Sequence, residues 1–411
     1  MKSFYIVIFT LCSFTVIAQK NSPKITATVQ SDSLDLEKLI VKNSFTYTNA
    51  KYEGPGWDLV VKEINKAHFV FVGEPHGIAE VAVFTGKLAE VFKPAALVVE
   101  IDPYTVNELK KISIQPTKYA SYLKANPYAF AFYSWDVEMD LIRQMQQNKV
   151  DIWGLNEINF LSLDQFFRTL ASEAKSPANK KIALQKAAEI RAIDLPIFGN
   201  ANKYGDFYGY KKLSVEAVDS LLIQFKKENK VCQKMLNDLK TSVPIFANTA
   251  YQKRVNLMKK NLLNYVAPYI TSDAINIPKL LFKFGANHMS RTNIQKGYFE
   301  VSNFADNLAE AGNHRTLHLL VIGKKGTQNQ MAPVDNDKAI IPYDITDGEL
   351  DIFVPFANKI IGDEWAYFNL IPIRIAIREG KLKLINPSLS EYVMNHDGLI
   401  ISGKATATRF L

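Results

Sequence analysis

Four apolar runs, each ending in polar or charged side chains, dominate the hydrophobic pattern of the chain. They cover residues 68–77, 95–102, 149–157 and 277–288. Each run is rich in β-branched and aromatic residues and ends near a glycine or a polar turn, which is typical of strands buried on both faces. The pattern therefore predicts four strands of a buried sheet.

Amphipathic segments lie between the first three runs and separate the predicted strands. Residues 78–92, 103–112 and 136–147 place their apolar side chains on one helical face. Alternation of strand and helix with short links predicts right-handed crossover units of a parallel sheet. The fold class is therefore α/β, with a central, mostly parallel β-sheet flanked by helices.

Within about 160–270 the apolar residues recur with helical spacing and there is little strand character. This pattern predicts a helical insertion or cap over the sheet. A further helix and strand are expected at 303–311 and 316–322. Residues 367–377 and 381–385 are rich in isoleucine and predict a terminal hairpin or edge pair, and 397–401 predicts a last short strand.

The N-terminus has the pattern of a secretory signal peptide. Lys2 precedes an apolar stretch that ends near Ala18 and is shorter than the roughly 20 residues a membrane helix needs. We therefore expect residues 1–18 to be removed, 19–50 to form a loosely attached arm and 51–411 to form one α/β domain. The protein is expected to be exported, to the periplasm or outside the cell, with no transmembrane segment after cleavage. Cys232 would then be the only cysteine, so no intramolecular disulfide is expected.

The formal net charge is +8, but the lysines are scattered in runs no longer than pairs. This distribution favours a solvated basic surface over a nucleic-acid-binding patch. The expected partner is therefore a small-molecule or peptide substrate, with no nucleic acid.

Polar side chains lie at the carboxyl end of each of the four predicted buried strands. In open α/β sheets the ligand crevice lies at the carboxyl ends of the strands, so these side chains are candidates for one site. Any one of them is more simply a turn or cap residue, but two histidines and several carboxylates together indicate acid–base chemistry. The pairs at the four strand ends are Glu74 and His76, Glu100 and Asp102, Asn156 and Glu157, and Asn287 and His288.

Two of these strand ends share the sequence Gly-x-x-His. Gly73 begins the first and Gly285 the second. We expect each glycine to let the chain turn sharply off its strand and bring the histidine over the strand end.

With these motifs the chain resembles the superfamily that joins erythromycin esterase-like hydrolases, ChaN-like haem-binding lipoproteins and TIKI/TraB-type proteases. The superfamily places a glutamate and an arginine between its two Gly-x-x-His motifs, and Glu100 and Arg254 occupy those places. Three further segments resemble the erythromycin esterase branch, namely Trp135–Glu138, Arg254–Asn261 and His396–Ile400. Pro75 alone separates Glu74 from His76, which follows the ChaN-like spacing.

The resemblance implies hydrolysis of an ester, lactone or amide. His76, oriented by Glu74 or Glu100, would act as general base on a water molecule, and Arg254 and His288 would stabilise the oxyanion. The implied supporting residues are Asp102, Glu138, Asn156 and Asn287.

Three alternatives remain open at this stage. His76, Glu100 and His288 form a plausible ligand set for a divalent metal ion. A ChaN-like protein would instead bind haem or another iron ligand, and a third possibility is a catalytically silent relative. A serine hydrolase is disfavoured because the sequence contains no Gly-x-Ser-x-Gly elbow.

Overall fold

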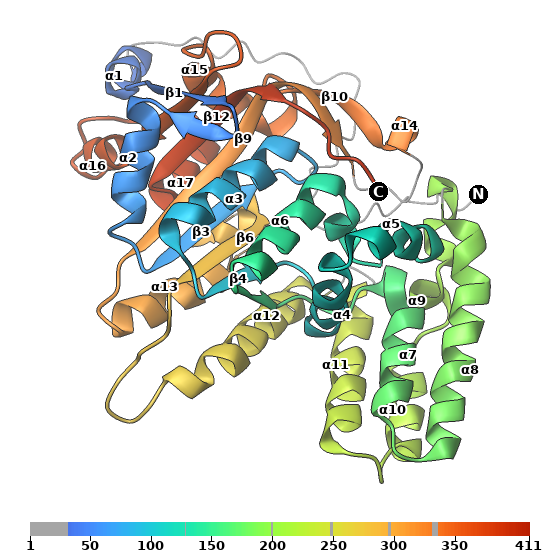
Figure 1. The fold of residues 1–411 in the computed structure, drawn as a ribbon. Coiled ribbons are helices and arrows are strands. Elements are labelled where there is room, and N and C mark those ends of the chain that lie inside the picture. Colours follow the sequence, from blue (N-terminus) through green and yellow to red (C-terminus); the bar gives the residue numbers. More distant parts are fainter. Residues whose placement is uncertain (1–31, 128, 199, 247–249, 295–296, 331–335) are drawn as a thin grey trace, which may run out of the picture. The chain divides into compact units, whose positions relative to one another are not determined.

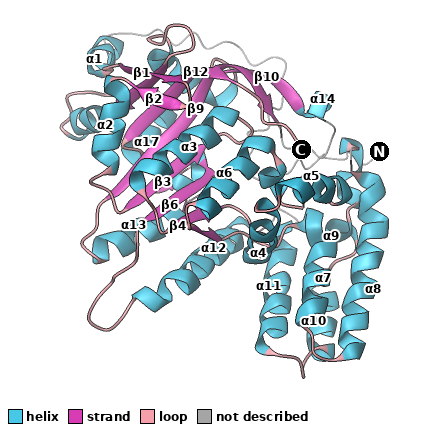
Figure 2. Cartoon of the chain, viewed as in Figure 1, coloured by secondary structure: helices cyan, strands magenta, loops and turns pink. Residues whose placement is uncertain are grey.

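The computed structural model describes residues 32–127, 129–198, 200–246, 250–294, 297–330 and 336–411 (Figures 1 and 2). The predicted signal peptide and the first part of the predicted arm lie outside these ranges. The chain divides into two compact units. One comprises the chain up to Lys93 with Leu281–Gln330 and Ile341–Ala407, and the other comprises Pro94–Leu280, Met331–Ile340 and Thr408–Leu411.

The first unit is built on strands in the order β2-β1-β11-β12-β9-β3-β6, with β10 beside β9. The neighbours β12, β9 and β3 are parallel, whereas β2, β1, β11 and β12 pair antiparallel. The strands are β1 (Asn43–Thr48), β2 (Lys51–Glu53), β3 (Phe69–Glu74), β6 (Leu280–Gly285), β9 (Thr316–Asn329), β10 (Ile340–Asp344), β11 (Trp365–Asn369) and β12 (Gly398–Ala405), with a short ribbon of β7 (Asn293–Ile294) and β8 (Tyr298–Phe299).

Alternate side chains along these strands point to the same face of the sheet and pack there against helices. Leu399 and Ile401 of β12 join a buried cluster with Phe356, Ile373 and Tyr392 from the helices near the C-terminus. Figure 1 shows α3 on the near side of the strands. The helices and 3-10 turns of this unit are α1 (Asp32–Leu39), α2 (Pro55–Ile64), α3 (Ala79–Phe92), η6 (Ala286–Met289), α13 (Val301–Ala311), η7 (Gly348–Phe353), α15 (Val354–Ala357), α16 (Ile371–Arg378) and α17 (Pro387–Asn395).

The second unit holds two parallel strands, β4 (Ala96–Val99) and β5 (Asp151–Gly154). Its α-helices are α4 (Pro103–Ser113), α5 (Pro116–Ala125), α6 (Asp136–Gln147), α7 (Leu163–Glu173), α8 (Pro177–Asp194), α9 (Tyr208–Lys211), α10 (Val215–Gln224), α11 (Lys230–Phe246), α12 (Tyr251–Val266) and α14 (Asn336–Ala339). Its 3-10 turns are η1 (Ala131–Ser134), η2 (Phe160–Ser162), η3 (Leu195–Ile197), η4 (Ala201–Asp206) and η5 (Ala267–Tyr269).

The predicted fold class is confirmed: the protein is α/β, with a mostly parallel central sheet flanked by helices. The four predicted strands correspond to β3, β4, β5 and β6, and the stretch predicted to be helical contains α7 to α12. Cys232 is buried. Across the described residues, none of the helices combines the length and the apolarity that crossing a membrane requires.

Two local expectations were wrong. Residues 367–377 do not form one arm of a hairpin, because β11 ends at Asn369 and α16 follows it. Pro372 lies at the start of α16, and Ile373, Ala376 and Ile377 share a helical face against the core. Residues 43–48 are not a loose arm, because they pair with β11 as strand β1.

Candidate active site

The first Gly-x-x-His motif ends strand β3 in the first unit. Glu74 is the last residue of β3, and Pro75 passes the chain into a turn that contains His76. His76 Nδ1 lies 3.0 Å from Glu74 Oε1, and both side chains are buried. Because a carboxylate oxygen only accepts, Nδ1 carries the proton, which makes Nε2 the basic nitrogen of the neutral ring.

Lys283 of β6 completes this group and was missed by the sequence analysis. Its Nζ donates to the same Glu74 oxygen at 2.7 Å, and its side chain is 0% exposed. Burial on its own would raise the pKa of the Glu74 carboxyl, but the Lys283 ammonium and the His76 imidazole outweigh burial and lower that pKa below its ordinary value. Glu74 therefore stays ionised and keeps the His76 tautomer fixed.

The end of strand β9 fixes the backbone of the same turn. Gln328 Nε2 donates to the His76 carbonyl at 2.7 Å, and the Asn329 amide donates to the Gly77 carbonyl at 3.0 Å. Gly77 has φ +89°, and a Cβ there would lie 2.0 Å from the Asn329 carbonyl oxygen. Only glycine fits this position, so the turn that carries His76 is sterically defined.

The motif glycines do not act as predicted. Gly285 has φ −52° and ψ 141°, an ordinary conformation that needs no glycine for a turn. At Gly73 the reason is close packing, since a Cβ would lie 3.2 Å from Ala286 Cα and 3.3 Å from Met289 Cβ. The strand end of the first motif thus packs directly against the turn of the second.

The second motif places His288 in η6, directly after β6. His288 Nδ1 lies 2.8 Å from Glu300 Oε2, and the imidazole is 0% exposed. Glu300 immediately precedes α13, and the sequence analysis missed it. The second imidazole is therefore oriented through Nδ1 by a carboxylate, as the first is. Asn287 is half-buried beside it, and its carbonyl accepts from Ser290 Oγ at 3.3 Å.

Arg254 and Glu100 come together in the second unit. Arg254 Nη2 donates to Glu100 Oε1 at 2.8 Å, and its Nε donates to Glu157 Oε2 at 2.9 Å and to Asn156 Oδ1 at 3.1 Å. Asn156 also donates to the Glu100 carbonyl at 3.3 Å. The arginine on α12 thus joins the side chains that follow β4 and β5, and its positive charge pairs with two carboxylates in a buried place.

Two other candidates of the second unit have different surroundings. Asp102 caps α4, because it accepts from the Tyr104 and Thr105 amides at 2.9 Å and from Thr105 Oγ1 at 2.6 Å. Burial raises the pKa of Asp102 despite these hydrogen bonds. Its contacts are those of a helix N-cap. Glu138 is buried in the first turn of α6.

Metal ligation was the other possibility raised for the sequence-predicted residues. Among the residues that the structure describes, no group of three or more histidine, cysteine, aspartate and glutamate side chains is arranged to hold a metal ion.

Signals for the two missed residues differ in strength. Lys283 is the only charged residue in the apolar run of β6, and a lone charge in a strand buried on both faces indicates a buried partner. Glu300 carries no such signal, because a glutamate before an amphipathic helix is common on solvated surfaces.

Comparison with solved structures finds the same fold in three proteins at low sequence identity. Erythromycin esterase EreC, as a mutant in its open conformation, matches with a TM-score of 0.56 and 12% identity over 89% of this chain and 98% of that chain. A Bacillus cereus protein matches with a TM-score of 0.54 and 16% identity over 92% of this chain and 98% of that chain. A succinoglycan biosynthesis protein matches with a TM-score of 0.56 and 12% identity over 93% of this chain and 100% of that chain. No family model and no curated protein matches the chain. The chain therefore has the fold of the erythromycin esterase structure, which agrees with the resemblance drawn from the motifs.

Proposed function

We propose that this protein is a hydrolase of the erythromycin esterase type, in which His76 activates water against an ester, lactone or amide carbonyl. The observation that carries the proposal is a buried pair of hydrogen bonds that links Lys283 to Glu74 and Glu74 to His76. Its two links measure 2.7 Å and 3.0 Å. A buried imidazole whose tautomer is fixed by an ionised carboxylate has the arrangement of a general base.

The proposed step moves one proton through His76. Nε2 takes a proton from water as the water oxygen attacks the carbonyl carbon, and the imidazolium then gives that proton to the leaving oxygen or nitrogen. Glu74 stabilises the imidazolium through Nδ1–H, while Lys283 keeps Glu74 ionised between turnovers. Lys283 also opposes excess protonation of His76, since its ammonium places positive charge on the same Glu74 oxygen that His76 contacts.

His288 is proposed to stabilise the negative charge that develops on the carbonyl oxygen. Its support is the Glu300 contact at 2.8 Å, which fixes the imidazole before substrate arrives. The participation of Arg254 and Glu100 in the same reaction stays a prediction that rests on the family resemblance. Their mutual contact supports an ion pair between Arg254 and Glu100.

The test is hydrolysis of a panel of chromogenic carboxylic esters by the wild type and His76→Ala. Removing a general base lowers turnover by about 10²–10⁴-fold. His314→Gln is the matched control, because that half-buried imidazole stacks on His68 at 3.7 Å and precedes β9. Equal turnover by His76→Ala and the wild type would remove His76 from the mechanism.

The haem-binding and metal-dependent alternatives are tested on the same protein. Haem titration followed by absorbance should give no Soret shift that depends on His76, and dialysis against EDTA should leave ester hydrolysis unchanged. A strong Soret shift lost in His76→Ala would favour haem binding. Activity lost to EDTA and restored by zinc would favour a metal-activated water.

Export is proposed from the N-terminal sequence alone, with cleavage near Ala18. N-terminal sequencing of the protein recovered from its native cells tests it.

A further inference from the structure

The five residues from His288 to Thr292 are each held by a separate polar partner in the first unit. These partners come from the chain entering α13, from β9, from the end of α17 and from the residue before β12. The contacts are His288 Nδ1 with Glu300 at 2.8 Å, the Met289 carbonyl with His318 Nδ1 at 2.8 Å, the Ser290 carbonyl with Ser302 Oγ at 2.6 Å, the Arg291 side chain with Asp397 at 2.6 and 2.7 Å, and the Thr292 amide with Asn395 Oδ1 at 2.7 Å.

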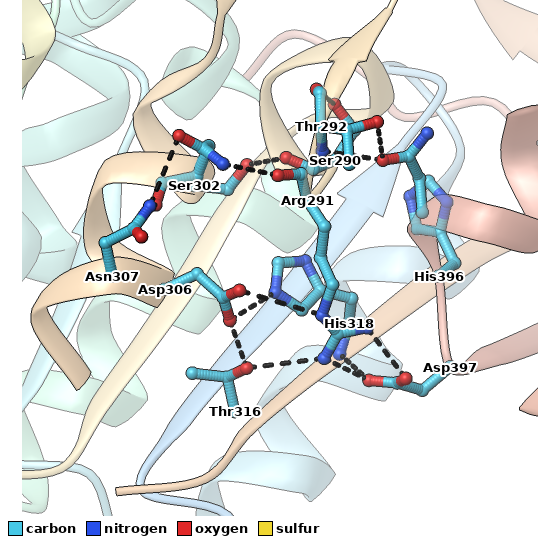
Figure 3. A network of polar contacts seen from close by, with 12 residues as sticks. Ser290, Arg291, Thr292, Ser302, Asp306, Asn307, Thr316, His318, His396 and Asp397 are labelled. Atoms are coloured by element: carbon cyan, nitrogen blue, oxygen red, sulfur yellow. Dashed lines mark hydrogen bonds and ion pairs between the residues drawn. The ribbon is translucent and has the colours of Figure 1, made fainter. Parts of the chain in front are cut away.

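Asp397 holds the Arg291 side chain of this network (Figure 3). Arg291 binds both of its oxygens, the His318 amide donates to Oδ2 at 3.0 Å, and Arg374 Nη1 donates to Oδ1 at 3.2 Å. Burial would raise the pKa of Asp397, but Arg291 in particular lowers it to about 2. Four donors on one carboxylate leave it little freedom to rotate, and the bidentate contact fixes the Arg291 guanidinium plane as well.

His318 connects the same network to the strand of the first motif. Its imidazole is 0% exposed, and it stacks on Phe71 of β3 with ring centroids 4.2 Å apart. Besides the Met289 carbonyl, it contacts Asp306 Oδ1 through Nε2 at 3.2 Å. Asp306 also accepts from Thr316, which Arg291 Nη2 contacts at 3.3 Å.

We propose that Arg291, His318 and Asp397 are positioning residues for His288. The inference rests on the proposed function of His288, and it gives a role to the closing His396–Ile400 segment, which the sequence analysis could only match to a family motif. Apolar packing would hold this turn at lower desolvation cost, but it tolerates sliding. Directional contacts on four consecutive residues hold the chain that directly follows the imidazole, as a preorganised catalytic group requires.

The test follows the His288 Nδ1–H proton by NMR in the full chain. The sequence has six histidines, so His288→Gln assigns the resonance by its loss. Arg291→Lys keeps the charge but loses the bidentate contact, and Asp397→Asn removes the carboxylate charge that Arg291 binds. We expect this proton to exchange with solvent about tenfold faster in both variants, through more frequent local opening. The His76 Nδ1–H proton should exchange as in the wild type.

The matched control is Lys42→Gln, which breaks another partly buried ion pair of the first unit, Lys42 with Glu364 at 2.7 Å. It should change neither proton. A purely structural role would lower the melting temperature of Arg291→Lys and leave the His288 proton unchanged, which overturns the proposal. Failure of Arg291→Lys to fold overturns it as well, because the network would then serve folding as a whole.

Ester hydrolysis separates this inference from the proposed function. With an active wild type, Arg291→Lys should lower kcat about tenfold and leave KM unchanged, because ground-state binding is untouched. An inactive wild type with the expected NMR result refutes the proposed function and supports positioning. An active wild type with an unchanged His288 proton refutes positioning alone.

Discussion

The two Gly-x-x-His segments have the same spacing, yet the carboxylates that orient their imidazoles have different origins. His76 is held by Glu74, two residues earlier in the same strand end. His288 is held by Glu300, twelve residues later and just before α13. One histidine therefore brings its partner with it, whereas the other depends on the folding of a separate helix.

The surroundings of the two pairs extend this difference. The first pair has a buried ammonium, Lys283, on its carboxylate, and β9 fixes only the backbone of its turn. The turn of the second pair is held by side chains from α13, β9 and the Asn395–Asp397 corner. A pair of residues close in sequence can be oriented by a few contacts, whereas a pair brought together by folding needs a network. The first arrangement suits the proposed general base, His76, and the second suits the proposed oxyanion-stabilising residue, His288.

The largest expected effect comes from changing the two carboxylates separately. Glu74→Gln should lower kcat by about 10³-fold, because it disturbs the His76 tautomer and leaves the Lys283 ammonium buried without its counterion. Glu300→Gln should lower kcat only about tenfold, because it weakens one electrostatic contribution among several. Steady-state kinetics on the same chromogenic ester measures both. Equal losses would contradict the division of roles between the motifs.

The same contrast explains how much of the site the sequence could predict. Glu74 and His76 lie two residues apart at the end of a strongly apolar strand, so local sequence sufficed to predict the strand and to name Glu74 as one of the two carboxylates that could orient His76. Motif order selected Arg254 and Glu100 as site candidates, but their contact at 2.8 Å could not be predicted, because no spacing rule relates residues so far apart. The α/β class followed from strand and helix periodicity, which is equally local.

The missed features are all tertiary. Glu300 and Asp397 acquire their roles only when α13 and the last strand pack beside η6. The isoleucines of α16 suggested a strand because β-branched residues favour sheets, but packing against the core decided for a helix. Gly73 looked like a turn residue, whereas it is the close packing of the second motif against it that favours glycine.

A second, smaller effect sharpens the role of the ammonium that only the first pair has. Lys283→Met removes a positive charge that opposes protonation of His76, so the acid limb of the rate profile should move to higher pH by about one unit. The loss of activity should therefore be greater at pH 6 than at pH 8. Rate profiles from pH 5 to 9 measure this shift, with Lys42→Gln as the control. An unmoved acid limb in an active Lys283→Met protein would show that Lys283 serves packing alone.

The smallest expected effect concerns the stability of the network around the second motif. The pKa of Asp397 is lowered to about 2 from an ordinary 3.8. A folded-state pKa below the unfolded one stabilises the protein above about pH 4, and that contribution is lost as the pH falls through about 2. The difference corresponds to about 2 kcal/mol at neutral pH. Asp397→Asn should therefore lower the free energy of unfolding by that order at pH 7.

Urea denaturation at several pH values measures this free energy for the wild type and Asp397→Asn. The gap between the two should narrow between pH 4 and pH 2, because the wild-type carboxylate then becomes neutral as the asparagine already is. A gap that stays constant with pH would show that the asparagine acts through shape and not through lost charge. The second motif would then be held by packing, and the contrast with the charge-dependent first motif would be sharper still.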